Sequence, residues 1–371
     1  MHEYYRRISG QRFHQAVLRR LSAAGDFVKR ADLVSTTPAV LNLYRSQLVN
    51  VGDISIGIGL KDAIKRSGIN NMLALSVDRE QNYCPRAQSV LIGGGSIVSP
   101  RLINRVSRTM PDSRVALFGV EVFGTEGDLA HGWPKNILCT GARSPRSVER
   151  ASSFGCDDTR LVPDAAWLIE RSAPGSGQRG APILGVNVTS WPKGYHFRRM
   201  ADSEGWVSAR DDLDKLIDYI GLVEAYILSA LSVGWKVVFV PFEVDDYYFS
   251  RAVFGWLQSD WDGVSFLRFR SDPKAVLESV TCMSRFLATR YHAHVFSLIA
   301  GVPLCFVEYS MQVRELRKSL SVSVSHCLPI ASCNGFQSHD GFVLSQGERD
   351  EIRQSAKCEL EYALRRIGAF P

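Results

Sequence analysis

The segment TRYHAHVFSLIAGVP, residues 289–303, combines titratable side chains with a long apolar run. Arg290, His292 and His294 stand where a short apolar segment ends and a helical pattern begins, near Tyr291. The first N–H groups of a helix lack partners within the helix and carry partial positive charge, so such a turn attracts anions. Histidine titrates near neutral pH, and His292 is expected to face a ligand cleft. The alternative is a histidine with a purely structural role at a helix start.

A second candidate is the segment LVNVGDISIGIGLKDAIKRSG, residues 48–68. Gly52 permits a tight turn, and Asp53 opens a predicted helix with an apolar face through Ile56, Leu60 and further residues. Aspartate is a favoured residue at the start of a helix, which is one explanation of Asp53. The other explanation is a carboxylate that points from the helix start into the cleft.

Three consecutive glycines follow a buried strand pattern in SVLIGGGSIVSP, residues 89–100. Glycine lets the backbone come close to a ligand or to another chain segment, so Gly94 and Gly95 are candidates for either kind of contact. The pattern is neither a dinucleotide-binding GxGxxG nor a P-loop, because the trailing Lys-Ser/Thr is missing.

Two arginines form the fourth candidate, in CTGARSPRSVERASSFG, residues 139–155. Arg143 directly follows a strand pattern, and Arg146 falls in the first turn of the next predicted helix. A cation at a helix N-terminus opposes the helix dipole, so an anion is expected nearby. That anion is either a ligand or a carboxylate of the protein, and the candidates for the latter are Asp157, Asp158 and Asp164.

The elements that must position these residues alternate between strand and helix patterns. Strands are predicted at 72–77, 89–93, 114–120, 137–141, 160–163, 183–188, 236–242, 264–269, 286–289 and 303–309, with helices between them. Continuous Val/Ile/Leu runs that alternate with helices are typical of parallel sheets covered on both faces. Ligands bind such sheets outside the carboxyl ends of the strands, where the candidate residues fall.

The chain is predicted to contain two Rossmann-like parallel-sheet domains that face each other across a cleft. The Gly/Pro/Ser-rich segment RSAPGSGQRGAP indicates a linker between them. The predicted parts are an N-terminal helical extension (1–44), a first domain (45–170), the linker (171–182), a second domain (183–345) and a C-terminal helix (346–371).

Composition limits the classes of partner. The 371 residues carry a net charge of +6, which is too weak and too scattered to predict nucleic-acid binding. The apolar runs are too short for a transmembrane helix. The eight cysteines lack a CxxC pair, which indicates reduced thiols in a cytoplasmic protein and no metal site. The basic N-terminal segment predicts a helix that either packs on a partner or lies on a membrane surface.

Five motifs in this order resemble the polysaccharide pyruvyl transferase family over roughly residues 45–335. The matching pieces are Asn50-x-Gly52-Asp53, LIGGGS, Arg143 with Ser147, LVPDAAW (161–167), and TRYHAHVFSLIAGVP. The last motif, T-R-x-H-A followed by an apolar helix and G-x-P, is the most specific of the five.

The resemblance implies a glycosyltransferase-B-like fold and transfer of a pyruvyl group from phosphoenolpyruvate to two sugar hydroxyls, forming a cyclic ketal. It implies no metal and no other cofactor. Arg143 and His292 match functional positions of the family. We expect Arg143 and Arg290 to bind the donor anions and His292 to transfer a proton or stabilise phosphate, because arginine suits carboxylate and phosphate. Our inference for Asp53 is a general base.

Further substrate contacts are expected from Asn50, Gly94, Gly95, Arg146, Tyr309 and Gln312. The implied acceptor is a sugar or lipid-linked oligosaccharide, which would bring the protein to the inner face of the cytoplasmic membrane as a peripheral protein. Neither a monomer nor a homo-oligomer is favoured by the sequence.

One position departs from the family pattern. The family shows Y-x-x-K after G-x-P, whereas this chain keeps Tyr309 and has Gln312 in place of the lysine. A neutral amide cannot replace an ammonium group against phosphate. Two alternatives therefore stay open: an enzyme of the same fold that uses a nucleotide-sugar donor, and a non-catalytic relative that binds a glycan.

Overall fold

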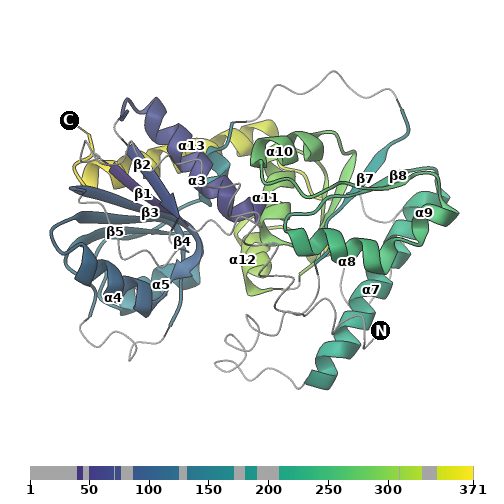
Figure 1. Ribbon diagram of the computed structural model, residues 1–371, viewed down its shortest axis with the longest axis horizontal. Helices are drawn as coiled ribbons and strands as arrows, with labels where there is room; N and C mark the ends of the chain where they lie inside the picture. Colours follow the sequence, from purple (N-terminus) through teal and green to yellow (C-terminus); the bar gives the residue numbers. More distant parts are fainter. Residues whose placement is uncertain are drawn as a thin grey trace.

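The protein contains two parallel β-sheets, each flanked by helices, that lie side by side (Figure 1). The structure is a computed structural model, which describes residues 40–44, 50–70, 72–76, 87–124, 132–170, 180–189, 209–308, 310–327 and 341–370. The predicted fold, two parallel α/β domains, is confirmed.

The first sheet has six parallel strands in the order β2-β1-β3-β4-β5-β6. These are β1 (Val40–Tyr44), β2 (Met72–Ser76), β3 (Ser89–Val98), β4 (Arg114–Val122), β5 (Ile137–Ala142) and β6 (Thr159–Leu161). Helices α4 (Pro100–Thr109) and α5 (Pro145–Ser153) cover one face, while α3 (Val51–Arg66) lies on the other (Figure 1). A short 3-10 turn, η3 (Ala165–Leu168), follows β6 and packs against α3.

The second sheet has five parallel strands in the order β11-β10-β7-β8-β9. These are β7 (Ile183–Val186), β8 (Lys236–Phe239), β9 (Val264–Phe266), β10 (Arg285–Ala288) and β11 (Leu304–Phe306). The helices of this domain are α7 (Ala209–Ser232), α8 (Val244–Phe254), α9 (Leu257–Asp260), α10 (Pro273–Thr281), α11 (Tyr291–Ala300) and α12 (Met311–Ser319), followed by the short η4 (Val324–His326).

Local sequence signals explain where the helices begin. The starts of α4, α5 and α10 combine a capping side chain with proline at the first helical position, namely Ser99, Ser144 and Asp272 before their prolines. Helix α11 ends at Gly301, which adopts φ 69°, a conformation that glycine takes without strain. These signals are local, which is why the predicted positions of these helices agree with the structure.

Strand β1 is the element that the sequence patterns do not show. Its residues, Val40–Tyr44, fall inside the segment that was assigned to an N-terminal helical extension, yet β1 pairs with both β2 and β3 in the interior of the first sheet. Five residues are too few for their period to separate a strand from a helix. The predicted helix itself, in residues 1–39, and most of the predicted linker, residues 171–179, lie outside the described residues.

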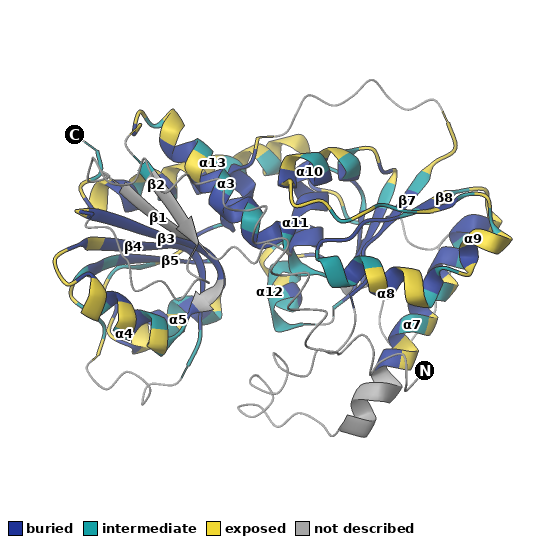
Figure 2. Cartoon of the chain, viewed as in Figure 1, coloured by how far each residue is buried: buried dark blue, intermediate teal, exposed yellow. Residues whose placement is uncertain are grey.

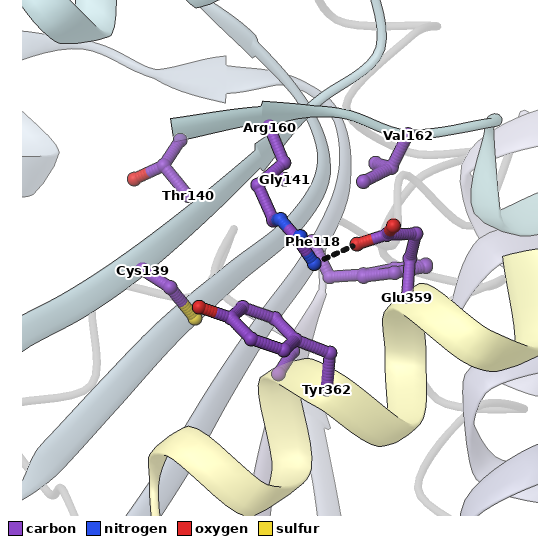
Figure 3. Close-up of a pocket in the computed structure, with 9 residues that line it drawn as sticks. Phe118, Cys139, Thr140, Gly141, Arg160, Val162, Glu359 and Tyr362 are labelled. Carbon is purple, nitrogen blue, oxygen red and sulfur yellow. Dashed lines mark hydrogen bonds and ion pairs between the residues drawn. The ribbon is translucent and has the colours of Figure 1, made fainter. Parts of the chain in front are cut away.

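The C-terminal helix α13 (Gln346–Arg366) joins the two domains (Figure 1). It follows the second domain in sequence but packs on β4 and β5 of the first sheet, and the Ser89 hydroxyl donates a 2.7 Å hydrogen bond to the carbonyl of Ile367. A small cavity remains between α13 and the strands β4–β6, beside the Arg160–Glu359 ion pair of 3.0 Å (Figure 3).

Three apolar clusters form the core of the described residues, and one of them contains residues of both domains. This shared cluster includes residues of α3 and η3 from the first domain, of α10 and α11 from the second, and of α13. Helix α11 is buried along almost its whole length at the centre of the molecule (Figure 2). The start of α11 and the start of α3 therefore meet where the two domains are in contact.

Candidate functional site

Asn50 ties the start of α3 to the second domain. Its Oδ1 accepts hydrogen bonds from the N–H of Gly52 (2.8 Å) and of Asp53 (3.3 Å), and its Nδ2 donates to Glu243 Oε1 (2.9 Å). The N–H of Val51 donates to the carbonyl of Phe242 at 2.9 Å. The first turn of α3 thus finds its acceptors within the protein, and Asn50 acts here as a helix cap and an interdomain contact.

Arg290 stands at the start of α11 between two carboxylates of the second domain. Its Nε lies 2.7 Å from Asp246 Oδ2, and its Nη2 lies 2.8 Å from Glu243 Oε2. Asp246 is fully buried and also accepts hydrogen bonds from the N–H of Phe242 and of Glu243, both at 3.0 Å. The backbone N–H of Arg290 donates to Asn187 Oδ1 at 3.0 Å. The Arg290 guanidinium is therefore held in one orientation, with 15% of the side chain exposed.

His292 reaches from α11 into the first domain. Its Nε2 lies 3.7 Å from Asp164 Oδ2, beyond hydrogen-bond distance but close enough for an ion pair when the ring is protonated. This nitrogen is buried and has no hydrogen-bond partner among the described residues. On its other side the ring packs on Gly52, where a Cβ atom would lie 2.0 Å from His292 Nδ1. Gly52 is therefore required by the close approach of His292.

Arg143 is buried at the end of β5, with 3% of its side chain exposed. Its Nη1 lies 2.7 Å from Asp164 Oδ2 and its Nε 3.1 Å from Glu121 Oε1. The guanidinium also stacks over the ring of Tyr291, 4.3 Å from the centroid. The sequence left two possible anions for Arg143, a ligand or a carboxylate of the protein. The structure shows an ion pair with the Asp164 carboxylate.

Two carboxylates of the first domain complete this network. Burial alone would raise the pKa of Asp164, but the charges of His292 and Arg143 and a hydrogen bond from the Ala166 N–H hold that pKa well below its usual range. Glu121 accepts hydrogen bonds from the hydroxyls of Ser144 (3.1 Å) and Ser147 (2.6 Å). A continuous set of charged groups thus runs from the α5 cap to His292.

Arg146 stands in the first turn of α5. Its charge and that of Arg150 act on Glu315, a carboxylate on α12 of the second domain that the sequence patterns did not indicate. Burial, and next the charge of Glu121, raise the pKa of Glu315 against these opposing effects.

The remaining predicted residues lie in three places. Gly94 and Gly95 have φ values of 62° and 78°. A Cβ atom at Gly94 would lie 2.0 Å from Ile56 Cγ2, so the close packing of α3 on β3 explains the glycine at position 94. Gln312 is half-buried in the first turn of α12, one turn before Glu315. Tyr309 lies outside the described residues.

Asp53 is buried in the first turn of α3, one residue from the glycine that contacts His292. The structure therefore brings together Asn50, Asp53, Arg143, Arg290 and His292 at the domain contact. Sequence reasoning missed Glu121 and Tyr291 as members of this site. It did note Glu243 and Asp246 at a strand end, but helix caps and solvated charge explained most of the acidic residues there. The two carboxylates follow β8 as Arg290 follows β10, and the structure pairs them with Arg290. The cavity under α13 is lined by none of the predicted residues.

The family model of polysaccharide pyruvyl transferases matches residues 50–311, more than half of the chain. The chain belongs to the polysaccharide pyruvyl transferase family. The match begins at Asn50 and ends in the first turn of α12, so it includes Asn50, Asp53, Arg143, Arg290 and His292. Among curated proteins, none matches this sequence.

Solved structures with a similar fold share little sequence with this chain. The S. aureus MnaA-UDP co-structure has a TM-score of 0.51 at 8% identity and covers 89% of this chain and 90% of its own. The UDP-GlcNAc 2-epimerase from Neisseria meningitidis bound to UDP-GlcNAc has a TM-score of 0.45 at 11% identity, with 89% and 93% covered. The first likeness supports the expected glycosyltransferase-B-like fold of this family member and nothing beyond its fold.

Of the helices that the structure describes, none is both long and apolar enough to cross a membrane.

Proposed function

We propose that the protein transfers a pyruvyl group from phosphoenolpyruvate to two hydroxyls of a sugar in a cell-surface polysaccharide or its precursor, forming a cyclic ketal. The observation that carries this proposal is the position of His292. It stands at the N-terminus of α11, in the contact between the domains, with an unpartnered buried nitrogen and the Asp164 carboxylate nearby. Membership of the polysaccharide pyruvyl transferase family supports the same reaction.

The start of α11 supplies groups that suit an anionic donor. The N–H groups of Ala293 and His294 donate to the carbonyl of Arg290, whereas no acceptor among the described residues binds the N–H of Tyr291 or His292. Such groups, with the positive end of the helix dipole, stabilise phosphate or carboxylate. Phosphoenolpyruvate carries both.

The two arginines differ in what they offer the donor. Arg290 keeps part of its side chain exposed beside Glu243, whereas Arg143 is almost completely buried between Glu121 and Asp164. We therefore assign donor contact to Arg290. Arg143 acts by holding Asp164, which in turn faces His292.

The protons that the proposed reaction takes up and releases balance. An acid protonates the methylene carbon of phosphoenolpyruvate, which leaves an oxocarbenium-like carbon that the first sugar hydroxyl attacks as it loses its proton. The second hydroxyl then replaces the phosphate, which leaves with the remaining proton. His292 is placed to protonate the donor or to stabilise the departing phosphate, and Asp53 is the candidate base for a sugar hydroxyl.

A second candidate function is transfer from a nucleotide-sugar donor. It is favoured by Gln312, which replaces the lysine of the family pattern, and by the fold shared with MnaA, whose structure holds UDP. The third hypothesis is a non-catalytic glycan-binding protein. It predicts that substitution of His292 leaves function intact.

Calorimetric titration with phosphoenolpyruvate, beside UDP and UDP-GlcNAc, separates these functions without knowledge of the acceptor. The proposal predicts binding of phosphoenolpyruvate that Arg290→Ala abolishes and Arg290→Lys weakens. Arg251→Ala, which removes a surface arginine of the same domain, is the matched control and should bind like the parent protein. Binding of UDP-GlcNAc without binding of phosphoenolpyruvate would establish the second candidate instead.

A further inference from the structure

Tyr291 is the first residue of α11, and its aromatic ring lies in the contact between the two domains. The guanidinium of Arg143, from the first domain, stacks over this ring with its Cζ 4.3 Å from the ring centroid. The ring of the next residue, His292, lies 5.2 Å from the Tyr291 ring, centroid to centroid, at an angle of 88°. Tyr291 therefore contacts an arginine of the first domain and the histidine that carries the proposed function.

These contacts close a ring of four side chains, two from each domain. Arg143 Nη1 lies 2.7 Å from Asp164 Oδ2, and the same carboxylate oxygen lies 3.7 Å from His292 Nε2. Because Tyr291 and His292 are consecutive in α11, the start of one helix reaches both members of the ion pair of Arg143 with Asp164. A shift of the Arg143 guanidinium would therefore move the carboxylate that faces His292.

The aromatic ring of Tyr291, rather than its hydroxyl, makes the contact with Arg143. No residue that the structure describes forms a hydrogen bond with the Tyr291 hydroxyl. Burial, and next the charge of Asp164, raise the pKa of this hydroxyl, so the side chain stays neutral. A cation over an aromatic face is bound more strongly when it is removed from water, and only 3% of the Arg143 side chain is exposed. Phenylalanine in place of Tyr291 would offer Arg143 the same face.

We propose that Tyr291 is a positioning residue, whose ring holds Arg143 in the orientation that keeps the Asp164 carboxylate opposite His292. The role of His292 in the reaction rests on the proposed function, whereas the contact between Tyr291 and Arg143 does not. The ring belongs to the second domain, while Arg143 and Asp164 belong to the first. The orientation of Asp164 thus depends on the contact between the domains.

NMR spectroscopy of the Arg143 side chain tests the contact without any ligand. Protein made with isotope-labelled arginine gives an Nε–H signal for Arg143, which is assigned through the backbone signals of the same residue. A proton above an aromatic ring is shifted upfield by the ring current. Tyr291→Leu should therefore move this signal downfield, whereas Tyr291→Phe should leave it close to its place in the parent protein. An unchanged signal in Tyr291→Leu would overturn the proposal.

Titration with phosphoenolpyruvate tests the consequence for the site. Tyr291→Leu should weaken binding about ten-fold, the effect of losing a cation–π contact that is shielded from water. Tyr291→Phe should keep the affinity within about two-fold of the parent value. Tyr362→Leu is the matched control, because Tyr362 on α13 lies under Arg160 with the same kind of stacking, 4.0 Å from Cζ to the ring centroid, outside the site. It should bind like the parent protein.

Arg143→Lys separates a positioning role from a general loss of structure. Lysine keeps the positive charge but lacks the planar group that stacks on a ring. If Tyr291 acts through Arg143, adding Tyr291→Leu to Arg143→Lys should weaken binding by less than about two-fold more. The proposal is overturned if Tyr291→Leu lowers the affinity equally in both backgrounds, or if Tyr291→Phe or Tyr362→Leu loses as much as Tyr291→Leu.

The two kinds of measurement distinguish this inference from the proposed function. A parent protein that does not bind phosphoenolpyruvate, with an Arg143 signal that moves in Tyr291→Leu and not in Tyr291→Phe, would reject the donor and support Tyr291 as the residue that holds Arg143. Binding of phosphoenolpyruvate that Arg290→Ala abolishes but Tyr291→Leu leaves unchanged would support the donor and overturn the positioning role.

Discussion

His292 rests directly on Gly52: a Cβ atom on this glycine would lie 2.0 Å from the imidazole Nδ1. The two residues come from different domains, at the starts of α11 and α3. The imidazole is thereby confined between Gly52 and the Asp164 carboxylate, 3.7 Å from its Nε2. His292 can therefore occupy this position only because residue 52 has no Cβ atom.

The first prediction concerns this contact. Gly52→Ala should displace His292 or part the two domains, and overpacking of a buried contact costs about 1–3 kcal/mol of unfolding free energy. Urea unfolding measures the stability, and titration with phosphoenolpyruvate measures the site. Gly221→Ala is the control, because a Cβ there meets no atom within 4 Å. Alanine at this exposed position of α7 should stabilise the protein slightly. Equal behaviour of the two variants would contradict the packing argument.

The second prediction concerns Asp164, whose carboxylate forms an ion pair with Arg143 and faces His292. Asp164→Asn leaves the buried Arg143 with one carboxylate fewer and should destabilise the protein by about 3 kcal/mol at neutral pH. Asp62→Asn, which breaks the exposed pair with Lys274, should cost less than about 1 kcal/mol. Similar losses in both variants would mean that burial adds nothing to the Asp164 interaction.

The same residue gives a dependence on pH. The folded protein holds the pKa of Asp164 well below its usual range, so its stabilising effect is complete above the usual carboxyl pKa and is lost as the pH falls below it. The difference in unfolding free energy between the parent protein and Asp164→Asn should therefore shrink between about pH 4 and pH 2. A difference that stays constant over this interval would show that the charge of Asp164 does not contribute.

The third prediction concerns His294, the second histidine of the T-R-x-H-A-H segment. It is fully buried against Phe306, and its Nδ1 donates a 2.7 Å hydrogen bond to the carbonyl of Arg290. Burial lowers the pKa of His294 to about 4, although the hydrogen bond to Arg290 opposes the shift. The unfolded chain therefore takes up this proton first, and stability should fall by about 3 kcal/mol as the pH drops from about 6.5 to 4.

His294→Phe removes the group that takes up this proton and keeps an aromatic ring at the position. Its unfolding free energy, measured by urea titration across this pH range, should decline less steeply than that of the parent protein. If His294→Phe keeps the pH dependence of the parent protein, the acid sensitivity comes from other groups.

The fourth prediction concerns the two roles of Asn50. Asn50→Ala removes the helix cap and the hydrogen bond to Glu243, with an expected loss of about 1–2 kcal/mol. Asn50→Asp keeps the acceptor for the α3 amides but places a carboxylate beside Glu243 and removes the donor. Asn50→Asp should therefore be at least as destabilising as Asn50→Ala in thermal unfolding at neutral pH. If Asn50→Asp is as stable as the parent protein, then Asn50 acts as a helix cap alone and its hydrogen bond to Glu243 adds no stability.

Local sequence patterns predicted most of the strands and helices, apart from β1, and the edge of each sheet at which the candidate residues lie. Ser144 before Pro145 fixes the start of α5 locally, and the strand pattern that ends at Thr289 places Arg290 and His292 at the carboxyl end of a parallel strand, β10. These assignments depend on residues close together in the chain. Caps, proline and strand patterns are read without knowledge of any distant partner.

Which charges meet depends on how the two domains pack. Arg143 pairs with Asp164, which also faces His292 from the other domain, and Arg290 pairs with Glu243 and Asp246. The partner of a strand-end side chain depends on which loop lies opposite once the two domains share a core. That juxtaposition, and the burial that makes each pair strong, is a property of the packed domains, because no local pattern encodes it.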